Sequence, residues 1–205
     1  MMPTAFKPAA TNHQLILASQ SPRRIELCGQ VGITADRICP ADIDETALAS
    51  ERPSDYARRM AEGKARAISE QYPSAFILGA DTVVACGRRI LPKAEDITTA
   101  EACLSVLSGR RHKVYGGVCV IMPDGRIKLR VSVSTVQFKQ LTAAEISAYL
   151  NSGEWDGKAG GYAIQGQASL FIQQISGSYS NIVGLDLNLV YGMLNSAGFR
   201  FAAAQ

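Results

Sequence analysis

The chain has 205 residues, of which 47% are hydrophobic and 19% charged, with a formal net charge of +3. This length suits one large domain or two tightly joined lobes, and the composition excludes a disordered chain. The small excess of basic over acidic residues excludes nucleic-acid binding through bulk charge, so we expect no nucleic-acid partner.

Cysteine and histidine are both scarce. The five cysteines are odd in number and include no C-x-x-C pair, and the two histidines leave little material for a histidine-rich metal site or a Ser-His-Asp triad. No apolar run reaches the length of a membrane span, and the N-terminus lacks the apolar core of a signal peptide. We therefore expect a cytoplasmic protein with reduced thiols and no membrane association.

The chain is expected to begin with a loose leader over residues 1–13, followed by one domain over residues 14–205. Residues 15–18 are apolar and predict a short buried strand, and Ser21 and Pro22 suit the N-cap and first position of a helix that ends at Gly32. Arg23 and Arg24 then fall in the first helical turn, where the helix dipole disfavours cations. A phosphate-bearing ligand would reverse that penalty, and the alternative is two solvated surface arginines.

A strand over residues 34–39 is expected to lead into the acidic segment 42–45, which contains Glu45. A helix is predicted from Ser54, its N-cap, to about Tyr72, with an apolar stripe in which Lys64 falls. A buried ammonium group without a partner is costly. Lys64 must therefore either extend outward into solvent or face a cleft that contains anions.

The apolar run over residues 76–85 predicts a central strand, and Asp81 interrupts it with a charge. Gly79 and Ala80, having little or no side chain, are expected to let a ligand approach the backbone beside Asp81; the alternative is that Asp81 forms a turn with Gly79. A turn over residues 86–89 returns the chain, so that Lys93 is expected near the level of Asp81 on a neighbouring strand or, alternatively, in a solvated loop.

The second half of the chain predicts further helices, a hairpin and a glycine-rich loop. Asp96 or Thr98 caps a helix that stops at Gly109, and Thr142 and Glu145 form a capping box. The other expected elements are a hairpin of strands over 113–122 and 126–138, a loop over 153–166, a strand over 169–175, a polar turn over 176–181 and a helix over 185–196. This order indicates an α/β or α+β fold with a mixed sheet and two lobes.

The arginine pair, the two lysines and the carboxylates are all awkwardly placed for a purely structural role. The simplest chemistry that uses all of them is metal-assisted cleavage of a polyphosphate. Basic groups would hold the phosphates, and carboxylates would bind a divalent cation.

Four ordered motifs resemble those of the Maf-like nucleotide pyrophosphatases. They are S-Q-S-P-R-R over residues 19–24, I-L-G-A-D-T over 77–82, G-K-A-G-G-Y-A-I-Q-G over 157–166 and S-G-S-Y-S-N-I-V-G-L over 176–185. The resemblance implies a mixed twisted sheet flanked by helices, with two lobes around a central cleft. It also implies hydrolysis of a nucleoside triphosphate to the monophosphate and pyrophosphate, and the G-A-D-T motif with Gln165 resembles the branch that prefers dTTP and UTP.

The resemblance also implies roles for individual residues. Asp81 would be the general base or a metal-linked carboxylate, with Glu45 as its acidic partner at the metal and Lys64 beside them in the catalytic group. The expected cofactor is a divalent cation, Mg²⁺, Mn²⁺ or Co²⁺, and family members commonly form homodimers. The resemblance implies that Arg23, Arg24, Lys64 and Lys93 bind phosphate. It implies that Arg23, Thr82 and Gln165 help to choose the base. The full set of expected substrate-binding residues is Ser19, Ser21, Arg23, Arg24, Thr82, Lys93 and Gln165.

This chain departs from the family pattern at two places. The family often has Gly-Lys-Pro where this chain has Pro92-Lys93-Ala94. It also often has proline where this chain has Asp186, which is expected to alter the start of the last helix. Two other functions stay open at this point. One is a nucleotide-sensing regulator of cell division that does not hydrolyse its ligand. The other is a pyrophosphatase that acts on ITP, XTP or methylated guanine nucleotides.

Overall fold

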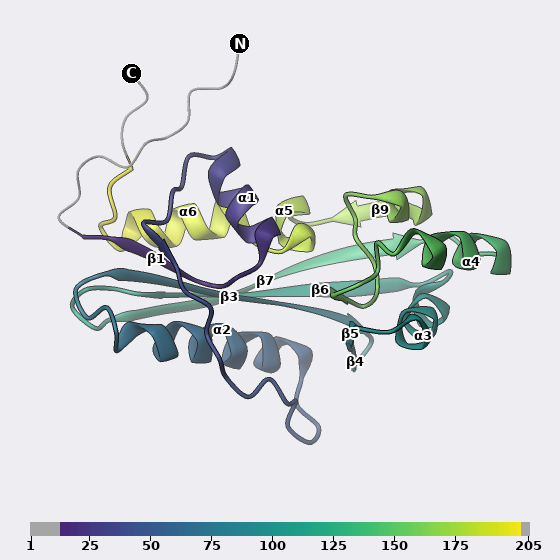
Figure 1. Cartoon of the computed structure of the whole chain (residues 1–205), viewed down its shortest axis with the longest axis horizontal. Coiled ribbons are helices and arrows are strands. Elements are labelled where there is room, and N and C mark those ends of the chain that lie inside the picture. Colours follow the sequence, from purple (N-terminus) through teal and green to yellow (C-terminus); the bar gives the residue numbers. More distant parts are fainter. Residues whose placement is uncertain (1–12, 202–205) are drawn as a thin grey trace, which may run out of the picture.

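The computed structural model describes residues 13–201 and is built around one mixed sheet (Figure 1). Seven strands form this sheet in the order β2-β1-β3-β6-β7-β9, with β4 paired to β3, and a two-stranded ribbon pairs β5 with β8. The strands are β1 (Leu15–Ala18), β2 (Arg37–Ile38), β3 (Phe76–Cys86), β4 (Arg89–Leu91), β5 (Lys93–Ala94), β6 (Arg111–Ile121), β7 (Ile127–Phe138), β8 (Lys158–Ala159) and β9 (Ile172–Ser176).

Helices cover both faces of the sheet. Figure 1 shows α2 on one face, α1, α5 and α6 on the other, and α3 and α4 gathered with β4 and β5 at one end. This arrangement confirms the predicted mixed sheet flanked by helices. The helices are α1 (Pro22–Gln30), α2 (Pro53–Ser69), α3 (Ile97–Leu107), α4 (Ala143–Ser152), α5 (Tyr179–Val183) and α6 (Leu187–Ser196). Within residues 13–201, none of these helices is both long and apolar enough to cross a bilayer.

The centre of the sheet is buried on both faces. β1 runs parallel to β3, and Leu15 and Leu17 point into the core beneath α1 and α6, whereas Ile16 and Ala18 pack into a second apolar cluster with α2. Because successive side chains of a strand point to opposite faces, a continuous apolar run is what a strand covered on both sides requires. The run over residues 76–85 predicted this central position correctly.

Two glycines bring α2 unusually close to the sheet. A Cβ atom on Gly79 would lie 2.4 Å from the Ala61 carbonyl oxygen, and one on Gly117 would lie 2.0 Å from the Ala57 carbonyl oxygen. The missing side chain of Gly79 therefore admits the backbone of a helix. The expectation that a ligand approaches the strand at Gly79 was wrong, because α2 occupies that space.

Several predicted boundaries differ from the structure. α2 begins at Pro53 with Arg52 as its N-cap and no side-chain cap, so Ser54 lies inside the first turn. The expected strand over 34–39 is reduced to Arg37–Ile38. The expected strand over 169–175 begins as a 3₁₀-helix over Gln167–Phe171 and continues as β9. The expected turn over 176–181 contains the start of α5. Of the expected leader, residues 1–12 lie outside the described residues, and His13 contacts the Ser74 carbonyl oxygen at 3.0 Å.

Other local predictions are confirmed. β6 and β7 form the long hairpin, Asp96 caps α3, and Thr142 and Glu145 form the capping box of α4. Asp186 is the N-cap of α6, which begins at Leu187, and it accepts a hydrogen bond from the Leu189 amide.

Candidate active site

A cleft of about 630 Å³ opens where β1 ends and the chain turns into α1. β1 pairs with β3 only as far as Gly79, and β4 pairs with the same edge of β3 only from Val84 onward. Residues 80–83 therefore have no strand partner along this edge in the described structure, and the cleft lies at the carboxyl end of parallel strands, a common ligand position in α/β folds. Its lining includes every site residue predicted from the sequence, namely Ser19, Ser21, Arg23, Arg24, Glu45, Lys64, Asp81, Thr82, Lys93 and Gln165.

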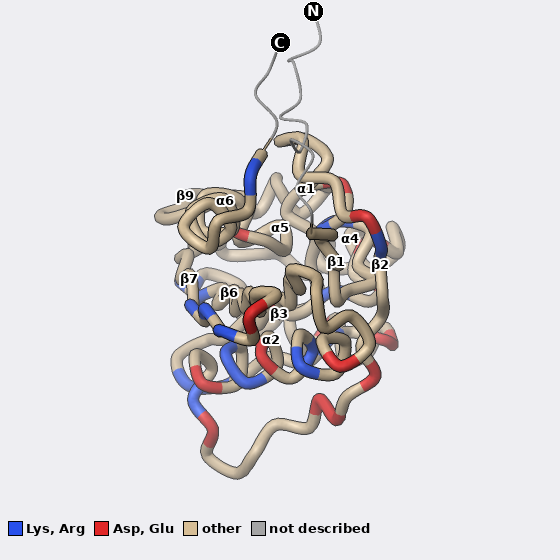
Figure 2. Tube along the Cα trace, turned by 90° about the vertical axis from the view of Figure 1, so that its left-hand side faces the viewer, with Lys and Arg blue, Asp and Glu red and all other residues tan. Residues whose placement is uncertain are grey.

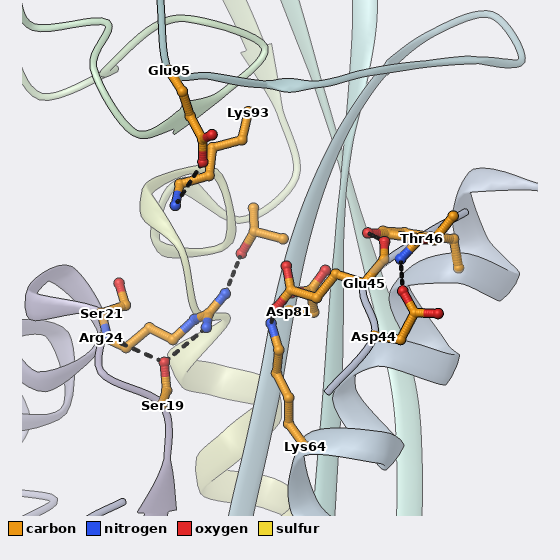
Figure 3. Close-up of polar contacts among 12 residues, drawn as sticks. Ser19, Ser21, Arg24, Asp44, Glu45, Thr46, Lys64, Asp81, Lys93 and Glu95 are labelled. Atoms are coloured by element: carbon orange, nitrogen blue, oxygen red, sulfur yellow. Dashed lines mark hydrogen bonds and ion pairs between the residues drawn. The ribbon is translucent and has the colours of Figure 1, made fainter. Parts of the chain in front are cut away.

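Arg24 is buried at the base of the cleft and joins three separate segments of the chain. Its Nη1 donates to Ser19 Oγ at 2.9 Å (Figure 3). Its Nε donates to the Gly184 carbonyl oxygen at 2.9 Å, and its Nη2 donates to Thr82 Oγ1 at 3.2 Å. Burial lowers the pKa of Arg24, and the negative charge of Asp81 partly opposes that shift. Arg24 is therefore a structural centre of the cleft wall as well as a cation within it.

The other residues of the first helical turn face the cleft differently. Ser21 is the N-cap of α1, but its side chain makes no capping bond, and its amide donates to Ser19 Oγ at 3.3 Å. Pro22 has no amide hydrogen, and the Arg24 amide donates to the Ser21 carbonyl oxygen at 3.1 Å, so the Arg23 amide is the one at the start of α1 that is left to meet an anion. Arg23 is half-buried, and burial lowers its pKa, so the alternative of two solvated surface arginines is wrong.

Lys64, Asp81 and Glu45 form the acidic centre of the cleft. Lys64 Nζ lies 2.7 Å from Asp81 Oδ1 and 2.7 Å from Glu45 Oε1, and Figure 3 shows both carboxylates converging on the ammonium group. The side chains of Lys64 and Asp81 are each 11% exposed, whereas that of Glu45 is 54% exposed. Lys64 therefore faces anions in a cleft rather than extending into solvent. Lys64 reaches this deep position because α2, which carries it, packs closely against the sheet at Gly79.

Asp81 and Thr82 point to opposite faces of β3, because adjacent residues of a strand alternate. The Thr82 hydroxyl donates to the Gly184 carbonyl oxygen at 3.0 Å and accepts from Arg24. Both its donor and its acceptor functions are thus engaged within the protein. Thr82 therefore helps to hold Arg24 in place.

The β5–β8 ribbon supplies the facing wall. Lys93 lies on β5, which pairs with β8 rather than with β3, so the expected position on a strand beside Asp81 was wrong although Lys93 still lines the cleft. Lys93 is exposed and lies 3.8 Å from Glu95. Gln165, also exposed, lines the cleft from the glycine-rich loop.

Sequence reasoning did not assign Lys158 or Tyr56 to the site. Lys158 lines the cleft from β8, and burial together with the positive charge of Arg23 lowers its pKa. Tyr56 lines it from α2, eight residues before Lys64 and so on the same helix face, which is the spacing that would have identified it. The cleft is lined by five basic and three acidic side chains, a balance that suits a polyanion: Arg23, Arg24, Lys64, Lys93 and Lys158, with Glu45, Asp81 and Asp156.

The donors around Lys64 fit a divalent cation shared with a ligand. Glu45 and Asp81 offer carboxylate oxygens, the ligands that Mg²⁺ and Mn²⁺ prefer, and one oxygen of each is paired with Lys64 Nζ. Among residues 13–201, no group of three or more His, Cys, Asp or Glu side chains could hold a metal by itself. Because Mg²⁺ commonly binds through one or two carboxylates together with substrate phosphates, two carboxylates are sufficient.

Comparison with known proteins agrees with this geometry. The chain is 58% identical over 185 residues to the dTTP/UTP pyrophosphatase of Paramagnetospirillum magneticum, a match that covers 90% of this chain and 97% of that protein. It is 53% identical to the dTTP/UTP pyrophosphatase of Rhodospirillum rubrum, over 91% of this chain and 89% of that protein. For the dTTP/UTP pyrophosphatase of Brucella abortus the identity is 52%, over 91% and 93% of the two chains.

Among solved structures, the Staphylococcus aureus Ham1 protein matches 89% of this chain and 98% of its own at a TM-score of 0.49 and 14% identity, too distant a likeness to bear on function. The family comparison is decisive, since it matches residues 14–197 to the Maf-like proteins. The chain belongs to the Maf-like protein family.

Proposed function

We propose that this protein is a nucleoside triphosphate pyrophosphatase that hydrolyses dTTP and UTP. Water attacks the α-phosphorus, the bond from the α-phosphorus to the bridging oxygen breaks, and the nucleoside monophosphate and pyrophosphate leave. The observation that carries the proposal is the cluster of Lys64, Asp81 and Glu45 inside a cleft whose other charged side chains are mostly basic. The names of the relatives support dTTP and UTP as substrates.

The residues divide by position. The α1 N-terminus and Arg24 hold phosphate oxygens at the base of the cleft, and Lys93 holds them from the facing ribbon, because ammonium and guanidinium groups are the usual partners of phosphate. Asp81 accepts a proton from the attacking water, and Lys64 keeps that carboxylate in place by a hydrogen bond of 2.7 Å. A divalent cation held by Glu45 and Asp81 would offset the charge that develops on the phosphates.

Base selection falls to the residues that line the outer part of the cleft. Arg23 and Gln165 have exposed or half-exposed side chains and are free to turn toward a base, whereas Thr82 contributes by fixing Arg24. An amide such as that of Gln165 offers both a donor and an acceptor, which complements the imide edge of uracil or thymine.

The test is pyrophosphate release from a panel of nucleoside triphosphates with Mg²⁺, Mn²⁺ and Co²⁺. We expect turnover of dTTP and UTP, and a fall of at least about 100-fold for Asp81→Asn, since a general base commonly contributes that much. Asp124→Asn, in the exposed turn between β6 and β7, is the matched control. Near-normal turnover by Asp81→Asn would reject the assignment.

The same panel separates the two other functions. Turnover confined to ITP, XTP or methylated guanine nucleotides would indicate the purine-directed enzyme. Tight binding without turnover under any metal would indicate a regulator.

A further inference from the structure

Glu45 lies in a segment with no helix or strand of its own. This segment, residues 42–52, which we call the acidic arm, runs between β2 and α2; Figure 2 shows it as a loop below α2 with its acidic residues in red. Every residue from Asp44 to Ser50 is exposed. Because regular backbone pairing is absent, the position of Glu45 depends on the side chains that hold the arm.

Two side chains of α2 hold the backbone of the arm at Glu45. Tyr56 Oη donates to the Glu45 carbonyl oxygen at 2.7 Å, and Arg59 Nη2 donates to the Thr46 carbonyl oxygen at 3.0 Å. Tyr56 and Arg59 are three residues apart and so share one face of the helix, where their groups reach adjacent carbonyl oxygens of the arm. These two bonds hold the peptide groups on either side of Thr46.

Arg59 also closes the arm on itself. Its Nε and Nη2 donate to Glu51 Oε1 and Oε2 at 2.8 and 2.7 Å, and Glu51 Oε2 accepts from the Leu48 amide at 3.0 Å. The Glu51 side chain is only 8% exposed. A bidentate guanidinium–carboxylate pair has a defined geometry, so it sets the path of the arm as well as its attachment.

The ion pair between Glu45 and Lys64 cannot hold the arm alone. The Glu45 side chain is 54% exposed, and an ion pair with that access to water contributes little. The Tyr56 hydroxyl meets the Glu45 backbone carbonyl oxygen, which can only accept, so Tyr56 is the donor of this bond.

We propose that Tyr56 and Arg59 are positioning residues that hold the acidic arm against α2 and thereby keep the Glu45 carboxylate opposite Asp81. This inference rests on the proposed function for its catalytic consequence, but the positioning itself is a property of the free protein. Tyr56 and Arg59 act through Glu45 and need not touch the substrate.

Tyr56→Phe tests the proposal because it removes one hydroxyl and keeps the ring. In the free protein, we expect faster hydrogen exchange at the hydrogen-bonded amides of the arm, those of Thr46, Leu48 and Glu51, in Tyr56→Phe and in Arg59→Gln, with exchange in β3 and β6 unchanged. Tyr179→Phe, at an exposed tyrosine of α5, is the matched control and should exchange as the wild type does. Unchanged exchange over residues 43–51 in both variants would overturn the proposal, whatever the activity of the protein.

A double-mutant cycle then tests the route through Glu45. Tyr56→Phe is expected to raise the Mn²⁺ concentration for half-maximal turnover about 2- to 10-fold, the effect of one hydrogen bond. In a Glu45→Gln background, the same substitution should add no further effect. An equal effect in both backgrounds would overturn the proposal. A wild-type protein without turnover would refute the proposed function instead, and the exchange data would still decide whether Tyr56 and Arg59 hold the arm.

Discussion

Replacing Lys64 by methionine is expected to lower the free energy of unfolding by about 3 kcal/mol at pH 7. Lys64 Nζ lies 2.7 Å from an oxygen of Asp81 and of Glu45, and the Asp81 side chain is 11% exposed. Removing one partner of a buried ion pair costs about 3–5 kcal/mol, because the other charge stays in a poorly solvated site. The cleft admits some water to Asp81, which places the cost at the low end of that range.

The measurement is the melting temperature by calorimetry. For a chain of this size about 1 kcal/mol corresponds to about 2–4 °C, so Lys64→Met should melt about 6–12 °C below the wild type. The double variant Lys64→Met/Asp81→Asn removes the stranded charge and should regain most of that loss without regaining turnover. Lys113→Met, at an exposed lysine, is the control. A single variant within about 2 °C of the wild type, or a double variant no more stable than the single one, would refute the reasoning.

Three further substitutions test other parts of the structure. Gly79→Ala should cost about 1–3 kcal/mol by thermal unfolding, because its Cβ would lie 2.4 Å from the Ala61 carbonyl oxygen, whereas Gly29→Ala, with open space around it, should be neutral or stabilising. Arg24→Lys should reduce kcat/KM at least about 10-fold, because one ammonium group cannot replace three directed bonds; unchanged steady-state kinetics would contradict this. Burial lowers the pKa of His112 to about 4, so the unfolded chain binds a proton between about pH 6.5 and pH 4 that the native state does not. In urea unfolding at pH 7 and pH 4.5, the wild type should therefore lose up to about 3 kcal/mol relative to His112→Gln.

Local chemistry predicted much of the site. Lys64 on an apolar stripe and Asp81 inside an apolar strand are costly placements unless they meet, and they do meet. Thr142 and Glu145 predicted a capping box from their spacing alone, and the structure contains it. These predictions succeeded because each depends on residues close in sequence or on a penalty that one kind of partner relieves.

The remaining features depend on contacts that no local pattern encodes. Arg24 bonds to Gly184, 160 residues away, so its role in joining three segments could not be predicted from the first turn of α1. The sequence at Gly79 predicted space for a ligand, because the absence of a side chain does not identify the neighbour that fills the space; in the structure α2 fills it. At the start of α2, Pro53 fixes the first turn by its backbone angle, and it prevailed over the capping tendency of Ser54.

Along one edge of β3, within the described part of the chain, four residues lie unpaired between the part that pairs with β1 and the part that pairs with β4. This arrangement affects which parts of the cleft can change in sequence without loss of stability. Residues 81–83 line the cleft and also pair with β6 in the centre of the sheet, so a change there alters both stability and chemistry. The β5–β8 ribbon carries Lys93 and Lys158 on two-residue strands outside the main sheet. Selectivity can therefore be re-engineered most freely on the ribbon, while β3 retains the reaction.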